Sequence, residues 1–131
     1  MKTDSGRRIP HLFVGQQLVA TLVIAFGAWF ACWALLHLGS WRFRAKLDEG
    51  HQLVTSGPFK FVRHPIYVAL NLLALGTAIW LPTTILLISL AWVVVCSDLR
   101  ARVEERLLTQ AFGSTYIEYC KRTSRFLPGV Y

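Results

Sequence analysis

Charged residues are absent from two long stretches of this sequence. No Lys, Arg, Asp or Glu occurs between Ile9 and Trp41, or between His64 and Ser97. The 131 residues are 54% hydrophobic and only 16% charged, which is too apolar for an ordinary soluble domain of this size. Because roughly 20 consecutive apolar residues cross the hydrocarbon core of a bilayer, the two stretches predict membrane-spanning helices.

Cysteine motifs are missing, and acidic residues are few. The three cysteines, Cys32, Cys96 and Cys120, have unrelated spacings, so the sequence predicts neither a disulfide framework nor a metal site. Seven acidic residues stand against 14 Lys and Arg, a formal net charge of +7. The basic residues flank the apolar stretches, which indicates membrane lipids, and no nucleic acid, as partners.

A signal-peptide cleavage site is also lacking. The first apolar stretch is longer than a signal-peptide core, so a retained span over about 13–38 follows a short basic lead at 1–12. Pro82 interrupts the second stretch, where proline removes a helical hydrogen bond. We therefore predict a short helical hairpin over 65–97, with a single kinked helix as the alternative.

Charged helical sequence follows the hairpin. Phe112-Gly113 predicts a helix end, and a second short amphipathic helix is expected over about 114–123. The fold class predicted for the single domain 1–131 is therefore all-α. It is an integral-membrane helical bundle of three transmembrane helices, with amphipathic helices in the tail at 98–128.

Topology follows from the distribution of positive charge. The loop at 39–64 and the tail are basic, whereas the turn between the hairpin arms carries no charge. The inside-positive rule therefore predicts a cytoplasmic loop and a cytoplasmic tail, with the N-terminus outside.

The stretch His51–Tyr67 is polar, rich in turn residues, and set between the apolar blocks. Gly57-Pro58 predicts a turn, and His64-Pro65 predicts a helix start whose free N–H groups favour an anion. On the other side of the hairpin, Arg100 and Glu104 share one helical face. The hairpin brings these two polar pieces to the same end of the molecule.

Three motifs in unbroken order resemble the isoprenylcysteine carboxyl methyltransferase family. They are Leu53-Val-Thr-Ser-Gly-Pro-Phe-Lys-Phe-Val-Arg-His-Pro-Ile-Tyr-Val, then Arg100-x-x-x-Glu104-Glu105-x-x-Leu with Phe112-Gly113-x-x-Tyr116-x-x-Tyr119, and the final Arg125-Phe-Leu-Pro128. The resemblance implies an integral-membrane enzyme that uses S-adenosylmethionine to methylate a carboxylate on a lipidated cysteine.

The resemblance also implies roles for individual residues. Arg100 matches the arginine associated with the methyl acceptor. Glu105 is interpreted either as a solvated neighbour of Glu104 or as the second cofactor-binding carboxylate used by phospholipid N-methyltransferases. The cofactor contacts would fall on His51, Gln52, Leu53, Val54, Phe59, His64, Pro65, Ile66, Tyr67 and Glu104.

Two departures from the family pattern affect the substrate prediction. Phe59 stands where the family commonly has tyrosine, so a hydroxyl contact there is lost. Only one span precedes the motif, where relatives usually have more. A second copy of the chain is one source for the missing wall of a lipid tunnel, which leaves a homo-oligomer open.

Three other functions remain as alternatives. A phospholipid methyltransferase acting on an ethanolamine amine would need a base, because its acceptor must lose a proton. A nicotinamide-dependent sterol-type reductase shares a related tail, although Gly-x-Gly-x-x-Gly is absent. A non-catalytic membrane scaffold is the third.

Overall fold

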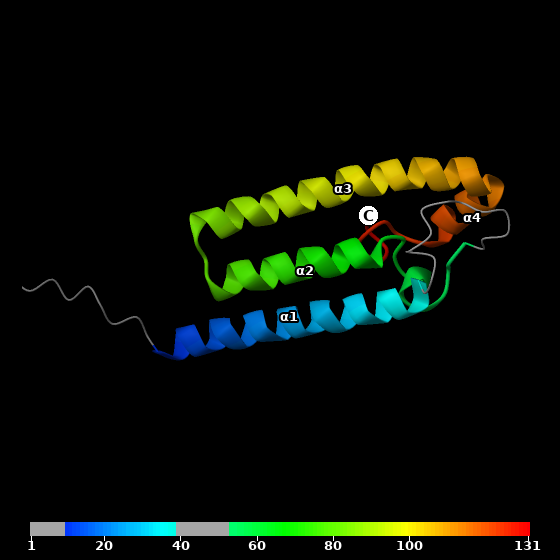
Figure 1. The fold of residues 1–131 in the computed structure, drawn as a ribbon. Helices are drawn as coiled ribbons and strands as arrows, with labels where there is room; N and C mark the ends of the chain where they lie inside the picture. Colours follow the sequence, from blue (N-terminus) through cyan, green and yellow to red (C-terminus); the bar gives the residue numbers. More distant parts are fainter. Residues whose placement is uncertain (1–9, 39–52) are drawn as a thin grey trace, which may run out of the picture.

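The computed structural model describes residues 10–38 and 53–131, and these are almost entirely helical (Figure 1). The elements in chain order are α1 (Pro10–Leu38), the 3-10 helix η2 (Gly57–Lys60), α2 (Pro65–Trp80), α3 (Thr84–Phe112) and α4 (Ser114–Arg122). The described residues contain no β-strand beyond one isolated bridge. The all-α prediction is confirmed.

Helix α2 lies between α1 and α3, and packs on both (Figure 1). It ends at Trp80, and α3 begins after a short turn at Thr84, with the Thr83 hydroxyl accepting from the Leu86 N–H at 3.3 Å. The helical hairpin is confirmed, and the single kinked helix is wrong. Pro82 falls in the turn, where its missing N–H costs no helical hydrogen bond.

Small residues set the distance between α1 and α2. Ala20 is fully buried, and a Cβ added to Gly76 would lie 2.5 Å from Cγ1 of Ile24. A Cβ added to Gly27 would lie 3.1 Å from Cβ of Leu72. Glycine at these two positions lets the helices approach closely, as small residues do in membrane helix pairs.

Among the residues that the structure describes, two helices are long and apolar enough to cross a membrane: α1 from Leu12 to Leu38, and α3 from Thr84 to Phe112. Only 17% and 11% of their most apolar windows are buried inside the molecule. A core helix of a soluble protein would be mostly buried, so the outward-facing apolar side chains indicate a membrane protein. The shorter apolar helix α2, as a third span, stays a prediction, as do the topology and the cytoplasmic side.

The C-terminal tail returns to the segment that precedes α2. Val62 and Ser124 form a parallel bridge. The Arg63 N–H donates to the Ser124 carbonyl at 2.8 Å, and the His64 N–H donates to the Arg125 carbonyl at 3.3 Å. The tail, α4, the start of α2 and the charged part of α3 therefore meet at one end of the bundle (Figure 1).

Candidate functional site

The His64–Tyr67 corner meets α3 at Glu104. Pro65 starts α2, which places Tyr67 in its first turn. The Tyr67 hydroxyl donates to Oε1 of Glu104 at 2.5 Å, and Nε of Arg100 donates to the Tyr67 hydroxyl at 3.3 Å. The two polar pieces expected at one end of the hairpin are thus in direct contact, 37 residues apart in the chain.

Glu105 points to a different set of partners from its neighbour. Its side chain is only 15% exposed, and it forms ion pairs with Arg63 and Arg125. Arg125 binds both of its oxygens in a fork, through Nε at 3.0 Å and Nη2 at 2.8 Å, and Nε of Arg63 adds a bond at 3.0 Å. The interpretation of Glu105 as a solvated neighbour is wrong.

The two carboxylates differ because adjacent helical residues point about 100° apart. Glu104 is 39% exposed and faces the Tyr67 hydroxyl, whereas both oxygens of Glu105 already accept from arginine. Glu104 therefore keeps free acceptor capacity for a ligand. Glu105 instead binds Arg63 and Arg125 within the protein.

His64 lies between these carboxylates. Its Nδ1 is 3.6 Å from Oε2 of Glu104, and its Nε2 is 3.2 Å from Oε1 of Glu105. Burial lowers the pKa of His64, but the hydrogen bonds to Glu104 and Glu105 outweigh it, so the net pKa is raised. The ring also stacks on Tyr67, with centroids 5.7 Å apart. The His64 ring contacts both carboxylates and so links the corner to the Glu105 ion pairs.

Three further hydrogen bonds fix the segment before α2 against α4 and the residue that follows it. The buried Tyr119 hydroxyl donates to the Phe59 carbonyl at 2.7 Å, and burial raises the pKa of Tyr119 to about 12, so the hydroxyl keeps its proton. Nη1 of Arg63 donates to the carbonyls of Cys120 and Thr123. These bonds fix the position of the His64–Tyr67 corner relative to α4.

The tail also reaches across to α3 through a second charged cluster. Nη1 of Arg125 donates to the Tyr131 hydroxyl at 2.5 Å and lies 3.4 Å from Asp98. Asp98 in turn pairs with Arg102 at 2.7 Å. The hydrogen bonds to Glu105 are the main reason that the pKa of Arg125 is raised further. Arg125 thus connects the tail to two turns of α3.

Two cavities lie at this end of the molecule. One of about 610 Å³ is lined by the η2 loop, α4 and the tail, and one of about 510 Å³ lies between α3 and α4. Neither is lined by Tyr67 or Glu104. The Tyr67 hydroxyl occupies only Oε1 of Glu104, so a ligand can bind the other oxygen or displace the hydroxyl.

Comparison with known proteins identifies the relatives of this chain. The sequence profile described as phospholipid methyltransferase matches residues 16–115. The chain belongs to this family. No solved structure matches it.

Several relatives of this chain are named protein-S-isoprenylcysteine O-methyltransferases. Protein-S-isoprenylcysteine O-methyltransferase B of Arabidopsis thaliana is 33% identical over 91% of this chain and 56% of its own length. Protein-S-isoprenylcysteine O-methyltransferase of Schizosaccharomyces pombe is 33% identical over 89% and 46%. The human protein of that name is 39% identical over 62% and 29%. The resemblance stated from the motifs is confirmed. The chain spans about half the length of the Arabidopsis and Schizosaccharomyces relatives, and under a third of the length of the human protein.

The fold of this chain brings together some of the predicted site residues. His64, Tyr67, Arg100, Glu104 and Glu105 lie in one connected network. Their binding of the cofactor or the methyl acceptor stays a prediction.

Other predicted contacts lie around this network. Leu53 and Val54 are half-buried ahead of η2, and Ile66 is half-buried in α2. Phe59 and Pro65 are buried. His51 and Gln52 lie outside the described residues.

Sequence reasoning missed the arginines that surround Glu105. Arg63 and Arg125 are 13% and 17% exposed, and Arg63 precedes α2 whereas Arg125 lies in the C-terminal tail. Their only signal was membership of the quoted motifs, since no local pattern relates Arg63 to Glu105. Gly57 also has a role beyond its turn: its φ is +59°, and a Cβ there would lie 2.5 Å from the His37 ring.

Proposed function

We propose that this protein transfers a methyl group from S-adenosylmethionine to a membrane-associated acceptor, the carboxylate of a lipidated cysteine. The observation that carries the proposal is the contact of Tyr67 with Glu104 beside Arg100. It joins a cofactor motif and an acceptor motif at the polar end of apolar helices. The named activities of the relatives support the same reaction class.

The chemistry of the corner fits the proposed cofactor. Glu104 is a half-exposed carboxylate that can accept hydrogen bonds from ribose hydroxyls. No side chain caps the N–H groups at the start of α2 within the described residues, so that helix end suits the carboxylate of the cofactor. The cofactor supplies a sulfonium-activated methyl group, and the task left to the protein is alignment.

Arg100 is suited to orient the acceptor. Its side chain is 75% exposed, and Nη2 lies 4.0 Å from Glu104, one turn along the same face. A carboxylate acceptor is ionised at neutral pH, so transfer needs no general base. The planar guanidinium can hold such a carboxylate through two parallel hydrogen bonds.

Replacement of Arg100 tests this role. We expect Arg100→Ala to lower methyl transfer to a farnesylcysteine substrate by about 100-fold, because an unaligned acceptor loses its attack geometry, while cofactor binding is kept. Arg106→Ala removes an exposed arginine of α3 and should leave transfer unchanged. Full turnover by Arg100→Ala would refute the assignment.

A second acceptor class is favoured by the description of the matching family profile, phospholipid methyltransferase. An ethanolamine amine must be deprotonated before it attacks, so this reaction would show a dependence on a base that a carboxylate acceptor does not need. Methylation of phosphatidylethanolamine, with no product from farnesylcysteine, would select this alternative.

The cofactor itself is tested by calorimetric titration of the purified protein in detergent. We expect S-adenosylhomocysteine to bind and NADPH not to bind, and Glu104→Ala to weaken binding by at least tenfold. Glu118→Ala is the matched control, since Glu118 is an exposed carboxylate that pairs only with nearby Lys121 among the described residues. Binding of NADPH alone would select a reductase, and binding of neither compound would favour a scaffold.

A further inference from the structure

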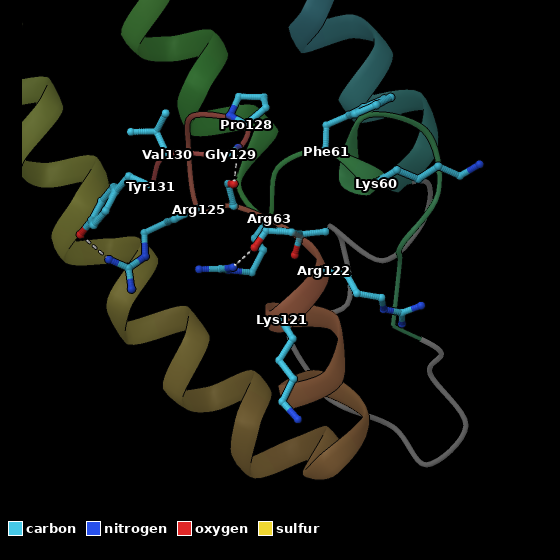
Figure 2. A pocket seen from close by; sticks show the side chains of 12 residues that line it. Lys60, Phe61, Arg63, Lys121, Arg122, Arg125, Pro128, Gly129, Val130 and Tyr131 are labelled. Atoms are coloured by element: carbon cyan, nitrogen blue, oxygen red, sulfur yellow. Dashed lines mark hydrogen bonds between the residues drawn. The ribbon is translucent and has the colours of Figure 1, made fainter.

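A basic groove is lined in part by Arg63 and Arg125, the arginines that bind Glu105. It is the cavity of about 610 Å³ between the η2 loop, α4 and the tail. Figure 2 shows Lys60 and Phe61 on the η2 side of the groove, Arg122 at the end of α4, and Val130 on the tail at the opposite side. Its cations are Lys60, Arg63, Lys121, Arg122 and Arg125, and no Asp or Glu lines it.

Within the described part of the chain, some of these cations have ion-pair partners and others do not. Arg63 and Arg125 share Glu105, and Lys121 pairs with Glu118. Lys60 and Arg122 are exposed, and neither forms an ion pair with any residue that the structure describes. The groove therefore keeps a surplus of positive charge, which favours an anion.

Apolar side chains also line the groove. Phe61 follows Lys60 on the η2 side, Val130 lies on the tail at the other side, and they are 57% and 80% exposed (Figure 2). The groove is at the end of the bundle where α1 ends and α2 begins, next to helices whose apolar surface faces outward (Figure 1). Cations beside exposed apolar groups suit the headgroup region of a bilayer, where a phosphate lies next to hydrocarbon.

We propose that the basic groove is a binding site for the phosphate of an anionic phospholipid, with Lys60 and Arg122 as the phosphate contacts and Phe61 and Val130 against the glycerol and upper acyl region. The site is separate from the proposed methyl-transfer site, because none of these four residues is assigned to the cofactor or the acceptor. Its occupation would fix the depth of the η2 loop and the tail at the membrane surface.

The test is native mass spectrometry of the full chain in detergent, titrated with phosphatidylglycerol or with phosphatidylcholine of identical acyl chains. Each lysine or arginine near an anionic lipid surface contributes about fivefold in affinity. We therefore expect phosphatidylglycerol to bind about 25-fold more tightly than phosphatidylcholine. Lys60→Gln and Arg122→Gln should each lower that preference about fivefold.

Arg106→Gln is the matched control, since it removes one exposed α3 charge from outside the groove. It should leave the preference unchanged. Equal losses in Arg106→Gln and Arg122→Gln, or equal affinity for the two lipids, would overturn the proposal. Displacement of phosphatidylglycerol by the same concentration of soluble glycerol 3-phosphate would assign the groove to a free phosphate and would also overturn it. Should Arg122→Gln not fold, Lys60→Gln decides the same question.

Discussion

The two ends of the helical bundle are held together by different forces. At the apolar end, α1 and α2 touch through Ala20 and Gly76, and the fit depends on the absence of side-chain atoms. At the polar end, Glu105 binds Arg63 and Arg125, and the fit depends on charge. Between the two ends, the Ser97 hydroxyl donates to the Asn71 side-chain oxygen at 3.2 Å and joins α3 to α2.

This difference separates stability from the candidate chemistry. Packing of small residues responds to volume and is insensitive to pH, whereas a buried ion network responds to the loss of any one charge. The corner at Tyr67 and Glu104 is attached to the charged end. Changes at Glu105 should therefore reach the candidate site, and changes at Gly76 should not.

The largest effect is expected at the centre of the charged end. Glu105→Gln leaves Arg63 and Arg125 without their shared carboxylate, and we expect the free energy of unfolding to fall by about 3 kcal/mol. Equilibrium unfolding in detergent measures it. Glu118→Gln breaks an exposed pair and should cost under about 0.5 kcal/mol, so similar losses in the two variants would contradict a special role for Glu105.

A change in volume should break the apolar end. In Gly76→Val the added atoms overlap Ile24, and overpacking of this kind costs about 2 kcal/mol. Gly15→Val is the control, because a Cβ there meets nothing within 4 Å. Unfolding of both variants, followed by helical circular dichroism, should show a loss only for Gly76→Val. A larger loss in Gly15→Val would place the tight contact elsewhere.

Loss of one buried hydroxyl should have a smaller effect. Tyr119→Phe keeps the ring but leaves the Phe59 carbonyl without its donor, and we expect a loss of about 1.5 kcal/mol. Hydrogen exchange should rise in the segment before α2. No change in stability or exchange would mean that water replaces the hydroxyl.

The smallest effect is expected from pH, and only at the charged end. Folding raises the pKa of His64. The contribution of His64 to stability is therefore complete below about pH 6.5, the pKa of histidine in the unfolded chain. It is lost as the pH rises through the pKa of His64 in the folded protein. Unfolding free energies at pH 6 and pH 9 should differ less in His64→Gln than in the unmodified protein. Gly76→Val should retain the full pH dependence, and its loss there would show that the two ends are coupled.

Local signals in the sequence placed most element boundaries. Pro65 begins α2, Pro82 falls between α2 and α3, and Gly113, at φ +55°, ends α3. These residues act through their own backbone restrictions, so their effect can be read without knowing the fold. The meeting of Tyr67 with Glu104 was also predictable, because a hairpin must return the chain to the end from which it started.

The roles of adjacent residues were less accessible. Glu104 and Glu105 are identical in type and next to each other, yet one is half-exposed at the corner and the other is enclosed by arginines. The rotation of α3 about its axis, and the path of the tail that carries Arg125, decide which carboxylate faces the corner and which is enclosed by arginines. Neither is encoded in a local pattern.

By itself, the sequence determined that this chain is helical and apolar, and that its polar groups gather at one end, because hydrophobicity and backbone restrictions act on each segment locally. Only the tertiary structure decided that Arg63, His64 and Arg125 converge on Glu105, leaving Glu104 with open capacity and Lys60 and Arg122 without a described ion-pair partner. The physical reason is that charge pairing depends on distances between residues up to 42 positions apart, and packing sets those distances.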